Sequence, residues 1–251
     1  MPIKPSILPG NAAPLRRGNH HLSRAQEFLK PIVFGGNDGI VTTFAIVAGF
    51  AGAQAEGAAD LGVLAVLVFG LANLLADALS MGLGEFLSSR SQHDLYRTRR
   101  AAELHQIADA SEGGAKAVAE ILQARGLAPD AAAEAARLLA QSPELSADLV
   151  MTYKYHLALP SSTRPAADGL ITFLSFVLLG SVPLIPYFLM TPTNLTFALS
   201  VAATFAALFL LGLVRWSATQ DSIVRAVVET VLVGGICAVV AYLVGAMVAA
   251  I

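Results

Sequence analysis

The chain has 251 residues, of which 55% are hydrophobic and only 14% are charged, and its mean hydropathy is +0.65. Soluble domains carry roughly 25% charged residues, so this composition excludes an ordinary soluble domain and indicates an integral membrane protein. The net charge of −2 gives no reason to expect a nucleic-acid partner. The one cysteine, Cys237, excludes an intrachain disulfide and a cysteine zinc cluster.

Residues 1–30 contain four prolines and several basic side chains, and we predict a cytosolic tail there. No apolar run precedes residue 31, so the first spanning helix is expected to direct membrane insertion itself. That span, at about 32–54, carries Asp38 near its start, among glycines that allow a neighbouring helix to approach closely. An alternative makes the segment around Asp38 a turn outside the bilayer. We disfavour it because the apolar run that starts at Gly39 is shorter than the ~20 residues of a span.

The second span, at about 61–88, carries four side chains spaced four residues apart, here called the polar stripe: Asn73, Asp77, Met81 and Glu85. Because a helix has about 3.6 residues per turn, they form one slowly winding row about 18 Å long. Amide, carboxylate and thioether donors together suit a first-row divalent metal better than calcium or magnesium. Two alternatives stay open, in which Met81 only packs helices and Glu85 is an interfacial carboxylate that ends the span.

Residues 89–167 are polar and alanine-rich, and we predict a small helical domain, here called the insert, rather than a linker. The second helix is expected to continue to about Asp109, because no breaker intervenes. Three further helices are predicted at about 115–125, from about Asp130, and from the N-cap Ser142 to about Leu159.

Three more spans are predicted, at about 168–190, 194–214 and 223–250. Pro183 and Pro186 cannot donate backbone hydrogen bonds, so we expect a kink near the outer end of the third span. The fourth span carries no charged residue and is expected to pack structurally. Glu229, near the start of the fifth, is placed with equal weight at the membrane interface and inside the bundle.

The distribution of basic residues indicates the orientation. Of the 16 lysines and arginines, five lie in 1–31, nine in the insert, and two flank the link between spans four and five. Five spans with a cytosolic N-terminus place all of them on the cytosolic side, as the positive-inside rule requires. We therefore expect an all-α membrane protein with a cytosolic tail at 1–30, transmembrane helices 1–2 at 31–88, a helical cytosolic domain at 89–167 and transmembrane helices 3–5 at 168–251.

In this orientation Asp38 and the Asp77–Glu85 segment lie at a similar depth. Carboxylates in a desolvated site can bind either a metal ion or protons, which is the physical basis of a proton-antiport hypothesis. The sequence contains no HExxH helix, no GxSxG elbow and no glycine-rich phosphate loop. We therefore expect no enzyme, and no cofactor besides the ions carried.

Three segments share a pattern with a known family: GGNDGIVTTFAIVAGFAGA at 35–53, ANLLADALSMGLGEFLSSRS at 72–91 and GSVPLIPYF at 180–188. Together they resemble the vacuolar iron transporter family, over all five spans and the position of the insert. The resemblance implies export of Fe²⁺, often with Mn²⁺, from the cytosol against protons. It also implies a homodimer with the metal pathway between protomers, lined by Asp38 and Met81. Many members carry glutamate at the position of Asn73, and Asp77, one turn later, is expected to substitute for it.

In the insert, Glu103 and Met151 match positions at which the resemblance implies metal collection. Acids are absent from four further such positions, namely Gln106, Gly114, Ala117 and Lys154. The insert is therefore expected to be mainly structural, or to bind metal weakly through Glu103, His105 and their neighbours. Two other functions stay open: a metal-responsive, non-transporting membrane protein that senses through the insert, and a transporter of another divalent cation. A bacterial inner membrane is the expected location, with a vacuolar or other organelle membrane as the alternative.

Overall fold

The structure is a computed structural model, and it describes residues 28–53, 59–109, 113–157, 164–190, 193–219 and 222–250. All regular secondary structure within these ranges is helical. The predicted N-terminal tail, apart from its last three residues, lies outside the described residues.

Five segments of the described chain are long and apolar enough to cross a membrane. They are formed by α2 (Leu29–Gly52), α3 (Ala59–Asp109), α7 (Pro165–Gly180) with the short helices that follow it, α9 (Asn194–Thr219) and α10 (Ile223–Ala249). The prediction of an all-α, multi-pass membrane protein with five spans is confirmed.

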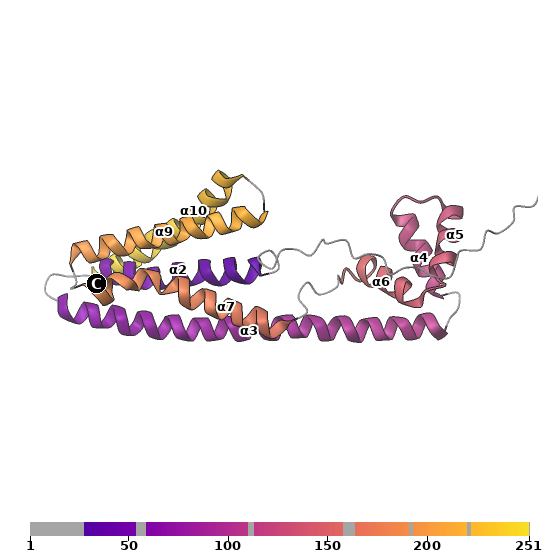
Figure 1. Ribbon diagram of the computed structural model, residues 1–251, viewed down its shortest axis with the longest axis horizontal. Helices are drawn as coiled ribbons and strands as arrows, with labels where there is room; N and C mark the ends of the chain where they lie inside the picture. Colours follow the sequence, from indigo (N-terminus) through magenta and orange to yellow (C-terminus); the bar gives the residue numbers. More distant parts are fainter. Residues whose placement is uncertain are drawn as a thin grey trace, which may run out of the picture.

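Helix α3 joins the membrane bundle to the insert (Figure 1). It has 51 residues, which at 1.5 Å per residue make it about 76 Å long. The hydrocarbon core of a bilayer is only about 30 Å thick, so roughly half of α3 projects beyond it. We call the end of the bundle from which α3 leaves toward the insert the insert end, and the opposite end the far end.

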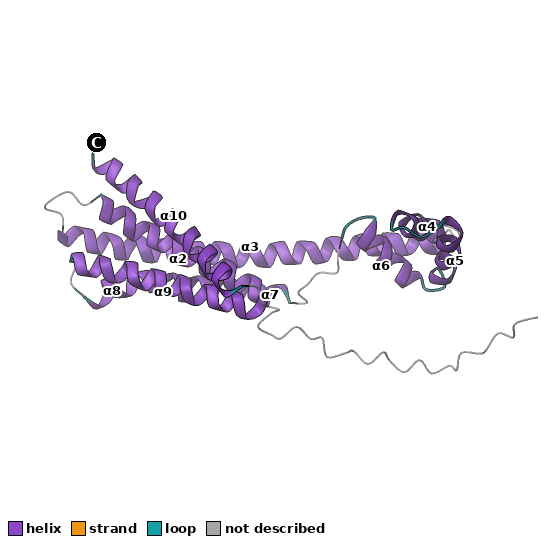
Figure 2. Ribbon diagram, turned by 90° about the horizontal axis from the view of Figure 1, so that it is seen from above, coloured by secondary structure: helices purple, strands orange, loops and turns teal. Residues whose placement is uncertain are grey.

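The insert contains α4 (Gly113–Ala124), α5 (Pro129–Leu139) and α6 (Pro143–Tyr153), which lie near the projecting end of α3 (Figures 1 and 2). Their shared core includes Val118, Ala136 and Val150. The Ser142 hydroxyl caps α6 by accepting a hydrogen bond from the Leu145 amide at 3.3 Å, as the sequence predicted. Small helices between the second and third spans are thereby confirmed.

The prediction that the last insert helix reaches Leu159 is wrong, because α6 ends at Tyr153. The chain turns through His156, whose φ of 54° lies in the left-handed region. The Leu157 amide then donates a hydrogen bond back to the Met151 carbonyl at 2.9 Å. A left-handed residue is a common way to end a helix, but glycine usually supplies it, and histidine gave no such signal in the sequence.

The third span breaks where the two prolines predicted it. Helix α7 ends at Gly180, and a 3₁₀ turn, η1 (Val182–Leu184), and a short helix, α8 (Ile185–Leu189), continue the span. A proline in such a position leaves a backbone carbonyl without its helical partner. The Ser200 hydroxyl of α9 donates to the Pro183 carbonyl at 2.6 Å, so a side chain of the neighbouring span stabilises the break.

Helix α2 lies centrally in the bundle and contacts α3, α7, α9 and α10 (Figure 2). A Cβ placed on Gly35 would lie 2.6 Å from the Thr172 carbonyl oxygen, and one placed on Gly39 would lie 2.5 Å from that of Phe176. No side chain fits at such distances, so α2 and α7 pack backbone against backbone, as small residues allow in membrane helices. This contact fixes the position of Asp38 in the bundle.

Candidate functional site

The polar stripe lies on one side of α3 within the bundle. All four of its side chains are half-buried. A different side of α3, about 200° around the helix from the stripe, carries leucines that are about half or more exposed, namely Leu75, Leu79, Leu83 and Leu87. Exposed leucines suit contact with lipid. The polar stripe itself lies between the buried row of Leu74, Ala78 and Gly82 and an exposed row of small residues, Ala76, Ser80 and Gly84.

The first two residues of the stripe are bonded to each other. Nδ2 of Asn73 donates a hydrogen bond to Oδ2 of Asp77, with a distance of 2.6 Å between the atoms. The amide nitrogen thus orients the carboxylate, while the amide oxygen keeps its acceptor capacity. An amide oxygen and a carboxylate are thus held one turn apart. Asp77 is the residue that we expect to substitute for the glutamate found in many members of the family at the position of Asn73.

Met81 has two environments. Part of its side chain packs against a buried cluster of Leu74, Ala78 and Phe176, at the contact between α3 and α7. The residue is nevertheless only half-buried, so packing accounts for part of its surface. A thioether in this position can serve both roles, because methionine is flexible and its sulfur is a soft ligand.

Asp38 is half-buried on α2, and its charge interacts with that of Asp77 on α3. The Thr42 hydroxyl, one turn further on, donates to the Asp38 backbone carbonyl at 2.8 Å and so does not use the carboxylate. Two carboxylates that repel each other can share a cation or a proton favourably. Asp38 and Asp77 thus lie on two helices that contact each other, α2 and α3.

A cavity of about 780 Å³ opens at the insert end between α2, α9 and α10. Its charged lining residues are Lys30, Asp38, Arg215 and Glu229. Asp38 therefore faces a space that reaches toward the same end of the bundle as the insert.

Glu229 joins α9 to α10 at this end. Its carboxylate accepts hydrogen bonds from Nη2 of Arg215 at 2.7 Å and from Nε of Arg225 at 3.0 Å. With 41% of the Glu229 side chain exposed, the structure favours the interface over the bundle interior for this residue.

Glu85, the last residue of the stripe, forms an ion pair with the start of α2. Nζ of Lys30 lies 3.2 Å from Oε1 of Glu85. The pair bridges two spans at the insert end. Lys30 also lines the cavity that contains Asp38.

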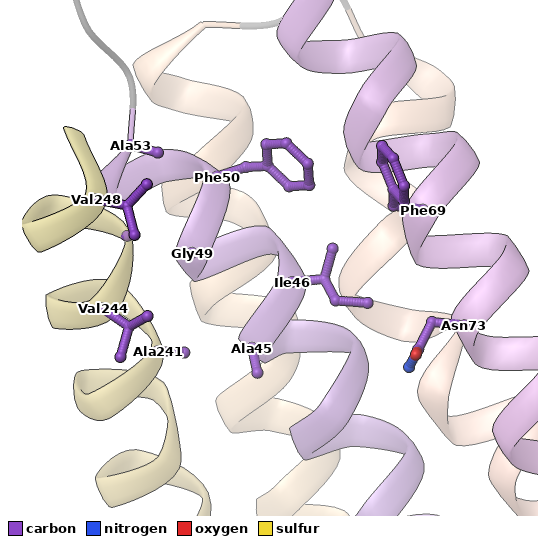
Figure 3. A pocket seen from close by; sticks show the side chains of 11 residues that line it. Ala45, Ile46, Gly49, Phe50, Ala53, Phe69, Asn73, Ala241, Val244 and Val248 are labelled. Atoms are coloured by element: carbon purple, nitrogen blue, oxygen red, sulfur yellow. The ribbon is translucent and has the colours of Figure 1, made fainter. Parts of the chain in front are cut away.

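A second cavity, of about 560 Å³, lies toward the far end between α2, α3 and α10. In Figure 3, Phe50 of α2 and Phe69 of α3 face each other across it, with their ring centroids 6.0 Å apart. Asn73 is the one polar side chain among its lining residues. The polar stripe therefore starts where this apolar cavity begins.

In the insert, Glu103 is 6% exposed, and its Oε2 accepts a hydrogen bond from the Tyr155 hydroxyl at 3.2 Å. One turn earlier on α3, Nε of Arg100 bonds Oδ1 of Asp148 on α6 at 2.6 Å. Both acids are thus engaged in contacts that hold the insert against α3.

Among the residues that the structure describes, no three His, Cys, Asp or Glu side chains lie close enough to hold one metal ion. The candidate ligands within a single chain therefore combine acids with the amide and thioether of the stripe. In the sequence, Lys30 and Arg215 indicate only the orientation of the spans. The Arg225–Glu229 pair had a sequence signal in its spacing of four residues, whereas Lys30 and Glu85 are 55 residues apart and had none.

Half-buried acids and a thioether within apolar spans, beside a cavity that opens at one end, define a multi-pass membrane protein of the ion-transporting class. The comparison with known families agrees, since residues 29–246 match the VIT family. The chain belongs to that family, as the three sequence segments indicated. It is accordingly a transporter-family protein and not an enzyme.

Relatives from plants and a parasite cover nearly the whole chain. Over 227 residues the chain is 31% identical to vacuolar iron transporter 1 of Arabidopsis thaliana, covering 89% of this chain and 88% of that protein. It is 30% identical to vacuolar iron transporter 1 of Oryza sativa subsp. japonica, with the same coverage of 89% and 88%. The vacuolar iron transporter of Toxoplasma gondii is 29% identical, with coverage of 92% and 78%.

Proposed function

We propose that the protein exports Fe²⁺, with Mn²⁺ as a second substrate, from the cytosol in exchange for protons. The observation that supports this proposal is that half-buried Asp38 and the polar stripe lie on two contacting helices, α2 and α3, within apolar spans. Iron is the metal in the names of the relatives. The donor set of carboxylate, amide oxygen and thioether suits a first-row divalent ion.

The insert end is the entrance for metal in this proposal. An ion arrives in the cavity beside Asp38 and at Glu85, and then passes Met81 and Asp77 toward Asn73. Asp38 and Asp77 carry the exchange, because each carboxylate can release a metal ion when it takes up a proton, and the reverse. Glu103 plays at most a weak part in metal binding, since Tyr155 already bonds its carboxylate.

The orientation follows from charge. We infer that the N-terminus and the insert lie in the cytosol, since basic residues concentrate in the tail, the insert and the link between α9 and α10. A bacterial inner membrane is the proposed location.

A homodimer is part of the proposal. The acids of the stripe are half exposed in one chain, and an ionised group beside lipid is costly. A second copy against α2 and α3 would remove these acids from lipid and place two sets of ligands around one pathway.

The test is metal flux into proteoliposomes that contain the purified full chain, with an imposed proton gradient. Fe²⁺ and Mn²⁺ uptake would be compared for the unmodified protein, for Asp38→Asn, and for Asp130→Asn as the control. Asp130 is an exposed acid in the first turn of α5, so the control removes the same charge outside the membrane. We expect gradient-dependent flux that falls at least about tenfold in Asp38→Asn, the scale on which metal sites respond to altered ligation, and that persists in Asp130→Asn.

Other outcomes would redirect the proposal. Flux without dependence on the gradient would keep the transporter and discard the antiport mechanism. If a folded dimer moved neither metal, another divalent cation or a sensor that acts through the insert would replace it.

A further inference from the structure

At the start of α2, a lysine forms an ion pair with a candidate metal ligand. The Lys30 ammonium lies 3.2 Å from a carboxylate oxygen of Glu85, although the two residues belong to different spans. Glu85 is the stripe residue nearest the insert end, and 18% of its side chain is exposed. An incoming cation would therefore meet Glu85 already occupied by an ammonium group.

Lys30 is also part of the cavity that reaches Asp38. The other cation in that lining, Arg215, is bonded to Glu229 at 2.7 Å, so these two charges largely offset each other. Lys30 instead has its carboxylate partner on the polar stripe. The Lys30 ammonium thus neutralises the last carboxylate of the stripe at the end where the cavity opens.

The Lys30–Glu85 ion pair is weak enough for a competing cation to separate it. The side chain of Lys30 is 75% exposed, and ion pairs that water reaches contribute little to stability and are screened by salt. A divalent cation carries twice the charge of the ammonium and binds a carboxylate in its place, while the long lysine side chain swings into water. A monovalent cation has no such advantage over the ammonium.

We propose that Lys30 is a specificity-determining residue at the metal entrance, occupying Glu85 in the metal-free state so that only a divalent cation displaces it. The inference rests on the proposed function and adds to it a residue outside the candidate ligands. Lys30 acts through Glu85 and is a positioning residue rather than a ligand, since an ammonium group cannot coordinate a metal.

The test measures initial rates of Mn²⁺ uptake in proteoliposomes over a range of metal concentrations. The variants are Lys30→Gln, Lys30→Arg, Glu85→Gln and the double variant Lys30→Gln/Glu85→Gln. Lys116→Gln is the matched control, because Lys116 is exposed on α4 in the insert. The same rates in the presence of excess Na⁺ report the discrimination against monovalent ions.

Lys30→Gln is expected to lower KM about threefold to tenfold, the effect of removing one nearby charge in a screened aqueous entrance, with kcat unchanged. Na⁺ should then inhibit more strongly than in the unmodified protein. Lys30→Arg should keep the unmodified KM because it keeps the charge, and Lys116→Gln should change nothing. In the Glu85→Gln background, Lys30→Gln should have no effect on KM, since coupled residues do not act additively.

An unchanged or raised KM in Lys30→Gln would overturn the inference, and so would an equal decrease in the Glu85→Gln background. A loss of kcat alone would assign Lys30 a purely structural role. Absence of uptake in the unmodified protein would instead be a failure of the proposed function, so the two failures are distinguishable.

Discussion

The two halves of α3 hold acids of the same kind in opposite ways. In the membrane half, Asp77 is half-buried and accepts one hydrogen bond from Asn73 of its own helix, which contacts the helix that carries Asp38. In the projecting half, Glu103 is buried and accepts a hydrogen bond from Tyr155, beyond the end of α6.

This difference shows how neighbours decide the role of a carboxylate. A second acid beside Asp77 leaves a net negative site that a cation can neutralise. The Tyr155 hydroxyl donates a hydrogen bond to the Glu103 carboxylate. This bond holds the segment after α6 against α3. We therefore propose that the membrane half of α3 binds metal and that the projecting half supports the insert.

The largest expected effect is on metal flux, and one matched pair of variants compares the two halves of α3. Asp77→Asn should lower metal flux at least about tenfold, because it removes the charge but keeps the shape and the bond to Asn73. Glu103→Gln should leave flux within about twofold. Initial rates in proteoliposomes, normalised to the amount of folded protein, measure both, and a greater loss in Glu103→Gln would reverse the assignment.

Stability provides a second contrast. Gly39→Ala should destabilise the bundle by about 1–3 kcal/mol, the usual cost of overpacking, because its Cβ would lie 2.5 Å from the Phe176 carbonyl oxygen. Gly84→Ala is the control, since no atom lies within 4 Å of the Cβ position there. Thermal unfolding in detergent measures the difference. Equal midpoints for the two variants would contradict the backbone contact between α2 and α7.

Met81→Leu tests whether the Met81 thioether binds metal or only packs against its neighbours. Leucine conserves most of the volume, so the packing against Phe176 is expected to survive within about 1.5 kcal/mol. The soft sulfur donor is lost, and KM for Fe²⁺ should rise more than KM for Mn²⁺, the harder of the two ions. Flux titrations with each metal test this. Unchanged constants for both metals would show that Met81 is a packing residue only.

The smallest effect is expected in the projecting half. Tyr155→Phe removes the hydroxyl that donates to Glu103 and should cost about 1 kcal/mol of stability, with metal flux unchanged. Unfolding followed by circular dichroism and flux on the same preparation measure the two quantities. A change of flux without a change of stability would give the insert a direct part in transport.

Much of this arrangement was accessible from sequence because its signals are local. Spacing of four residues put Asn73, Asp77, Met81 and Glu85 in one row, and hydropathy located the five spans. Two prolines predicted the break in the third span. Each of these patterns operates within one helix, where periodicity is fixed by backbone geometry.

Contacts between helices were not accessible in the same way. The Lys30–Glu85 pair joins residues 55 positions apart, and no periodicity links them. The early end of α6 depends on a left-handed histidine, His156, where sequence rules look for glycine. The engagement of Glu103 by Tyr155 likewise required the three-dimensional packing of the insert against α3.

The most direct test of the central claim is the location of bound metal. Crystals of the full chain grown with Mn²⁺ would be measured at a wavelength where manganese scatters anomalously. We expect an anomalous peak within bonding distance of Asp38 or Asp77, in the membrane half. A peak only beside Glu103 in the insert, with none along the polar stripe, would contradict it.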